Sequence, residues 1–146
     1  MIITNRVAWA ANLAAVIAAE YTTTTIILLK TLLAEDESTT LANVIDVANE
    51  ADYGGYARVA GVTFGTPFFG PDGIAKSAAP LVNVPSNGSA PFEQIFGYAL
   101  VDAGVTTLKG IHNFPGPINI AALGDTVAFV PEINLPSPQS AAALTE

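Results

Sequence analysis

A chain of 146 residues in which 51% are hydrophobic and only 12% are charged fits one folded domain with unusually few surface charges. Its net charge of −8 argues against nucleic-acid binding, because phosphates are bound by Lys and Arg, and only five scattered residues are of these types. Without cysteine there is no disulfide, thiol nucleophile or thiolate metal site. Two explanations of the low charge stay open: some surface is buried against other chains, or it is covered by Thr, Ser, Asn and small side chains.

The first 21 residues predict a helix. Thr4 or Asn5 can cap it through a side-chain oxygen, and apolar residues follow at helical spacing. Trp9, Val16 and several alanines widen the apolar surface, so the helix could pack on its own domain or on a neighbouring subunit. We expect neither a leader nor a membrane anchor, because Asn12 interrupts an apolar run shorter than the roughly 20 residues of a membrane span.

The next segments predict a buried strand and a short helix. Four threonines precede the run Ile26–Leu33, which favours a strand covered on both faces, although a helix over Leu28–Leu33 stays open. Residues 39–50 place Leu41, Val44, Ile45 and Ala48 at helical spacing. A short helix and a long loop with one helical turn are the two alternatives there.

From residue 56 onward, short apolar runs cut by Gly, Pro, Asn or Asp are typical of an all-β sandwich or barrel. Turns are predicted at 70–73, 87–88, 103–104 and 115–117. Pro131, which cannot donate to a ladder, indicates an edge or a bulge in the last strand. The predicted strands are 56–66, 74–79, 81–84, 94–102 (covered on two sides), 105–114, 118–121 and 126–135.

These elements predict a mainly β chain: a single β-sandwich (jelly-roll-like) domain over residues 22–135. An N-terminal helix or arm (1–21) precedes it, and an extended C-terminal arm rich in Pro, Ser and Ala (136–146) follows it.

Groups able to carry out chemistry are sparse. His112 is the sole histidine, and no nucleophile elbow accompanies it. No calcium-loop spacing occurs, and the Gly-Gly pair at 54–55, the turn at 70–73 and Gly116 do not form a phosphate loop. We therefore predict no catalytic, cofactor-binding or metal-binding residue. The carboxylates that gather in the first third of the chain are Glu35, Asp36, Glu37, Asp46, Glu50 and Asp52.

Three segments resemble a family of small structural proteins of tailed bacteriophages: E-A-D-Y-G-G-Y-A-R-V at Glu50–Val59, F-G-Y-A-L-V-D-A-G at Phe96–Gly104, and G-D-T-V-A-F-V-P at Gly124–Pro131. The first is similar to the family's "GYA" signature and the second to its "YGYYVTD" run. The resemblance spans about residues 26–135. It implies a non-enzymatic β-sandwich of the virion, often trimeric, and it transfers no catalytic residue.

The expected function is that of a capsid cement or decoration protein that stabilises the capsid lattice by covering seams between subunits. A tail or head-fibre component that binds a receptor or carbohydrate is the alternative. The expected partners are the major capsid protein or other virion proteins and further copies of the chain, with no nucleic acid, membrane or cofactor. The expected location is the capsid surface of the virion, after synthesis in the host cytoplasm. The predicted interface residues lie in the terminal segments: Trp9, Leu13, Val16, Ile17, Pro136 and Pro138.

Overall fold

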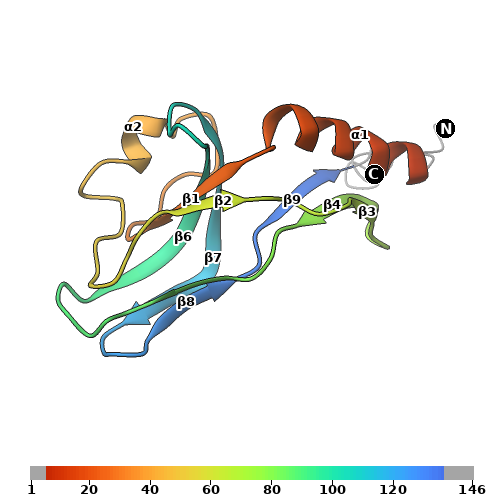
Figure 1. The fold of residues 1–146 in the computed structure, drawn as a ribbon. Coiled ribbons are helices and arrows are strands. Elements are labelled where there is room, and N and C mark those ends of the chain that lie inside the picture. Colours follow the sequence, from red (N-terminus) through yellow and green to blue (C-terminus); the bar gives the residue numbers. More distant parts are fainter. Residues whose placement is uncertain (1–5, 137–146) are drawn as a thin grey trace, which may run out of the picture. The chain divides into compact units, whose positions relative to one another are not determined.

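The computed structural model describes residues 6–136, with side-chain burial for residues 8–135, and shows a mainly β chain with an N-terminal helix. Every pairing between its named strands is antiparallel. The chain divides into two compact units, which are described separately (Figure 1). The first contains α1 (Arg6–Glu20), β3 (Phe68–Phe69), β4 (Ile74–Ala78) and β9 (Glu132–Pro136). The second contains β1 (Thr24–Leu29), α2 (Leu41–Val44), β2 (Val59–Val62), β5 (Val82–Pro85), β6 (Glu93–Asp102), β7 (Leu108–Ile120) and β8 (Thr126–Phe129).

The first unit is a helix packed on a three-stranded sheet of order β3-β4-β9. The predicted helix is confirmed, while its expected cap residues Thr4 and Asn5 lie outside the described residues. Leu13 of α1 is 1% exposed, and the indole Nε1 of Trp9 donates to the carbonyl oxygen of Leu135 over 3.1 Å. The predicted turn at residues 70–73 is also confirmed, with Gly73 at φ +78° between β3 and β4.

The second unit is built on a four-stranded sheet of order β2-β1-β6-β7, whose central strands are covered on both faces. Because side chains alternate along a strand, Ile27 and Ala99 share one face and pack in a cluster with Val44 of α2. On the other face, Tyr98 stacks on Phe129 of β8 with ring centroids 4.4 Å apart. All six residues of β1 are buried, so the predicted doubly covered strand is confirmed, and the helix alternative over 28–33 is wrong.

Two predictions made at prolines are wrong. Residues 108–120 form one strand, β7, and not two strands joined by a turn at 115–117. Strand β7 lies at the edge of the sheet, so it has a hydrogen-bonded neighbour on one side only. The missing N–H groups of its prolines are tolerated at such an edge. A bulge takes up the extra chain: residues 113 and 118 of β7 pair with residues 97 and 95 of β6.

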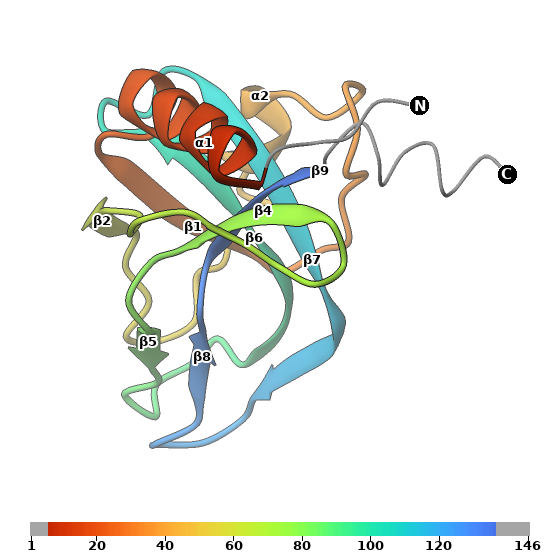
Figure 2. The same ribbon diagram turned by 90° about the vertical axis from the view of Figure 1, so that its right-hand side faces the viewer.

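The predicted strand 126–135 is divided at Pro131. Its first part, β8, pairs with β5, and its second part, β9, pairs with β4 (Figure 2). The carbonyl oxygen of Pro131 still accepts from the Ala79 N–H over 2.9 Å, but Pro131 has no N–H to continue the β8 ladder.

Two other elements are shorter than predicted. In the predicted strand 56–66, only residues 59–62 form β2, because the Tyr56 N–H is used in a turn to the Tyr53 carbonyl and Gly61 adopts φ +73°. Between residues 39 and 50 the single helical turn of α2 forms, capped by Thr40, which agrees with the loop alternative.

Candidate functional site

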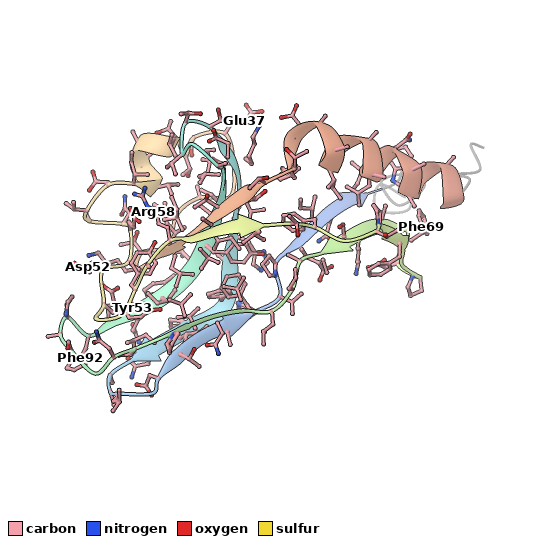
Figure 3. The ribbon with its side chains drawn as sticks, viewed as in Figure 1. Glu37, Asp52, Tyr53, Arg58, Phe69 and Phe92 are labelled. Carbon is pink, nitrogen blue, oxygen red and sulfur yellow. The ribbon has the colours of Figure 1, made fainter. Side chains whose placement is uncertain are left out.

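The segment from Glu50 to Arg58, which carries the first resemblance motif, leads from α2 to β2 in the second unit (Figure 3). Both carboxylate oxygens of Glu50 accept from the Arg58 guanidinium over 2.7 Å. The Tyr56 hydroxyl donates to Glu50 Oε1 over 3.0 Å and accepts from the backbone N–H of Leu28 over 3.4 Å. Burial, reinforced by the Glu50 charge, raises the pKa of Tyr56 well above its ordinary 10. The phenol therefore stays neutral and ties the segment to β1.

A second polar cluster lies at the start of the same motif. Glu93 Oε1 accepts from the backbone N–H groups of Asp52 and Tyr53 over 2.8 and 2.9 Å, while Lys30 Nζ lies 2.8 Å from Asp52 Oδ1 and 3.9 Å from Glu93 Oε2. Burial raises the pKa of Glu93, and the hydrogen bond from Lys30 lowers the pKa of Asp52. The Tyr53 hydroxyl donates to the Val84 carbonyl over 2.8 Å, and burial raises its pKa to about 12. These groups hold the motif between β1, β5 and β6.

The glycine pair of the motif, Gly54-Gly55, lets the backbone of this segment lie close to the backbone of residues 87–89. The Gly54 carbonyl accepts from the Asn87 N–H over 2.9 Å, and a Cβ on Gly54 would lie 2.4 Å from the Ser89 carbonyl oxygen. Gly55 has φ +94°, a conformation that side chains disfavour. The resemblance motif is therefore a structural clip between strands, and its polar side chains are occupied by internal bonds.

Three of the six noted carboxylates line one pocket. Glu35, Asp36 and Glu37 face residues 108–111 of β7 across a cavity of about 360 Å³. Glu35 Oε1 accepts from the Asn113 N–H, and hydrogen bonds from Ser38 lower the pKa of Asp36. Asp46, Glu50 and Asp52 do not line this pocket. Across the described residues, no three His, Asp or Glu side chains are grouped so that they could hold a metal ion.

His112 is exposed on β7 in an aromatic setting. Its ring lies 5.4 Å from that of Tyr98 and edge-on to that of Phe114 at 6.4 Å. These rings contact His112 by packing.

The predicted interface residues are distributed unevenly on α1. Leu13 is buried, Trp9 and Ile17 are half-buried within the first unit, and Val16 is 38% exposed. Pro136 ends β9 opposite Ile74, and Pro138 lies outside the described residues.

Apart from Val16, the outward surface of α1 is formed by residues that the sequence analysis did not name as interface residues. Among residues 8–20, whose side chains the structure describes, seven of nine exposed residues are Ala or Val, and the other two are Asn12 and Glu20. The signal was present, because alanines recur at 8, 11, 15 and 18, the three-four spacing of one helix face. The exposed apolar residues of α1 are Ala8, Ala11, Ala14, Ala15, Val16, Ala18 and Ala19, and we call them the alanine face.

None of the helices formed by residues 6–136 has the length and apolar character needed to cross a bilayer. No family model, curated protein or solved structure matches this chain.

Proposed function

We propose that this chain is a non-enzymatic virion structural protein, a capsid cement or decoration protein that binds the major capsid lattice at the virion surface and assembles as a homotrimer. The observation that carries this proposal is the alanine face of α1. A helix that is apolar all round is normally buried, yet α1 leaves this face exposed within its own chain. A neighbouring subunit supplies the missing cover.

The chemistry of the face suits tight packing against protein. Alanine side chains let a second helix or strand approach closely, and their burial requires little loss of side-chain entropy. The face carries no basic residue that would draw it to nucleic acid. A contact with another virion protein or another copy is the use that these properties favour.

The fold supports the same proposal. In the second unit, the rings of Tyr98 and Phe114 meet Phe129 between the four-stranded sheet and the β5–β8 pair. We take this arrangement as a jelly-roll-like β-sandwich, the architecture that the resemblance to phage structural proteins implies. The motif residues of that resemblance are engaged in scaffold bonds, as expected for a protein that works through its surfaces.

A second candidate, adsorption by a tail or head-fibre component, is favoured by the loops at one end of the second unit. Phe92 is 51% exposed and Leu123 is 76% exposed, and the two loops meet where Gly88 approaches Leu123. Exposed apolar groups on loops held by a rigid scaffold are a common form of receptor-binding surface.

The test is Ala15→Glu, which puts a carboxylate in the middle of the alanine face, against Ala42→Glu on the exposed side of α2 as the matched control. Burying an unpaired carboxylate costs several kcal/mol. We expect at least about tenfold weaker trimer formation, measured by light scattering, and a similar loss of occupancy on particles that carry the chain. Ala42→Glu should behave as wild type.

Cryo-electron microscopy of the intact particle then separates the two candidates. Density on the capsid surface supports the cement role, and density confined to the tail or to fibres supports adsorption. A folded Ala15→Glu variant that assembles and binds like wild type would contradict the proposed interface.

A further inference from the structure

The turn after β5 contains the one Asn-Gly pair of the chain, Asn87-Gly88. Its atoms are placed in a way that bears on covalent chemistry. Asn87 is exposed, and its Oδ1 accepts from the Ser89 N–H over 2.9 Å. Gly88 adopts φ +81°, and its N–H donates to the hydroxyl oxygen of Ser86 over 3.1 Å. Ser86 itself is only 4% exposed.

We propose that Asn87-Gly88 is a site of spontaneous covalent modification, and that the Ser86 hydroxyl restrains this reaction in the folded protein. In the reaction, the backbone nitrogen of Gly88 attacks Cγ of Asn87. A new C–N bond closes a five-membered imide ring, the bond from Cγ to Nδ2 breaks, and ammonia leaves with the amide proton of Gly88. Water then opens the ring at either carbonyl and gives aspartate or isoaspartate.

Two features favour the reaction at this position. Gly88 has no side chain to hinder the approach of its nitrogen. The Ser89 N–H already bonds Oδ1, so it polarises the side-chain carbonyl and stabilises the oxyanion that forms during the attack. The electrophile is therefore prepared by the turn.

The nucleophile is restrained by the same turn. The hydrogen bond to Ser86 Oγ stabilises the neutral N–H form of the Gly88 amide. The Gly88 nitrogen must lose this proton in order to react. The Asn87 N–H is fixed to the Gly54 carbonyl, which limits rotation of the backbone towards the ring geometry. Ser86 and Gly54 therefore hold Asn87 and Gly88 in the unreacted conformation.

The modification would reach beyond the turn. Isoaspartate adds a methylene to the main chain beside Gly54, where Asn87 Oδ1 already lies within 2.5 Å of the position that a Cβ would take. The contact between the glycine pair and the 86–89 turn would open, and the exposed loops at this end of the second unit would loosen with it. This inference does not depend on the proposed function.

The test follows the loss of the Asn87 amide by peptide mapping and mass spectrometry during incubation of the full chain at mildly alkaline pH. Folded wild type should react roughly five-fold more slowly than the chain unfolded in urea, the factor that one hydrogen bond of ordinary net strength corresponds to. Folded Ser86→Ala should react roughly five-fold faster than folded wild type, and Ser86→Thr, which keeps a hydroxyl, should stay near wild type. Asn83 and Asn119, exposed but followed by Val and Ile, are internal controls that should stay intact.

Equal rates of Asn87 amide loss in the folded and the urea-unfolded wild type would show that the fold does not restrain the reaction. This comparison needs no variant. A Ser86→Ala protein that stays folded by circular dichroism and reacts at the wild-type rate would assign the restraint to something other than Ser86. An intact Asn87 in the unfolded chain would remove the modification site altogether.

Discussion

Helix α1 and strand β1 are both apolar, yet the protein uses them in opposite ways. All six residues of β1 are buried, with covered side chains on both faces of its sheet. In α1, only Leu13 is buried among the residues with described side chains, and the outward face is alanine. Composition therefore does not determine burial. Strand β1 is covered because layers of its own chain lie on both faces of its sheet, whereas the alanine face of α1 has no such layer.

The two units also differ in how polar groups are placed. The clip at residues 50–58 engages two tyrosine hydroxyls, three carboxylates and two cations in internal bonds of the second unit. In the first unit, the Trp9 side chain of α1 is bonded to the Leu135 carbonyl oxygen of β9. We expect substitutions in the second unit to lower stability more strongly than substitutions in the first. The first of the following three predictions probes the second unit alone, and the other two compare the units.

The largest effect is expected at Gly97 in β6. A Cβ there would lie 2.3 Å from the His112 carbonyl oxygen and 2.9 Å from the Cα of Asn113, both of which are backbone atoms that cannot rotate away. Gly97→Ala should destabilise the protein by more than about 3 kcal/mol or prevent folding. Gly110→Ala in β7, where nothing lies within 4 Å of the added Cβ, is the matched control and should change stability by less than about 0.5 kcal/mol. Urea unfolding measures both, and equal midpoints would show that the sheet tolerates a wider spacing.

The sequence predicted the central strands well because their signal is local. An unbroken apolar run between turn residues indicates a strand covered on two sides, and β1 and β6 are such strands. The turn at 70–73 was predictable for the same reason, since Pro71 restricts its own φ and Gly73 readily adopts the φ of +78° found there.

The prolines and the clip were harder because their outcome depends on distant partners. Whether Pro115 ends a strand depends on whether that strand is at an edge, and this is a property of the sheet. Glu93 lies 41 residues from Asp52 in sequence, so nothing local marks the pair. Four of the six predicted interface residues lie on α1, and the other two are Pro136 and Pro138. Of the four, Leu13 is buried, Trp9 and Ile17 are half-buried and only Val16 is exposed, because large apolar side chains tend to fill the core while alanine is left outside.

A matched pair of hydroxyl and indole deletions sharpens the comparison of the two units. Tyr53→Phe removes the donor to the Val84 carbonyl in a site where Tyr53 is 2% exposed, which leaves a buried acceptor without its partner. Trp9→Phe removes the donor to the Leu135 carbonyl, where Trp9 is half-buried and water can replace the indole. We expect losses of about 1–3 kcal/mol for Tyr53→Phe and about 0.5–1.5 kcal/mol for Trp9→Phe.

Urea unfolding followed by hydrogen exchange assigns each loss to its unit. Relative to wild type, Tyr53→Phe should speed exchange in β5, and Trp9→Phe should speed exchange in α1. A larger loss for Trp9→Phe would mean that α1 is held as firmly as the clip, and the contrast between the units would fail.

The smallest effect is a pH dependence at the Glu93–Asp52–Lys30 cluster. Burial raises the pKa of Glu93 above its ordinary 4.5, so the folded protein binds a proton there more tightly than the unfolded chain. The Glu93 contribution to stability therefore rises as the pH falls from neutral through this raised pKa towards 4.5. Hydrogen bonding from Lys30 lowers the pKa of Asp52 below 3.8, so its contribution is lost only as the pH falls below that value.

Glu93→Gln removes the pH-dependent contribution of Glu93 to stability. The glutamine side chain still offers an oxygen that accepts from the Asp52 and Tyr53 N–H groups. The difference in urea midpoint between wild type and Glu93→Gln should therefore change between neutral pH and pH 4.5, in the direction of a relatively more stable wild type at the lower pH. Glu132→Gln, on the exposed side of β9, is the control from the first unit. A constant difference between Glu93→Gln and wild type over this range would show that burial does not penalise the Glu93 charge.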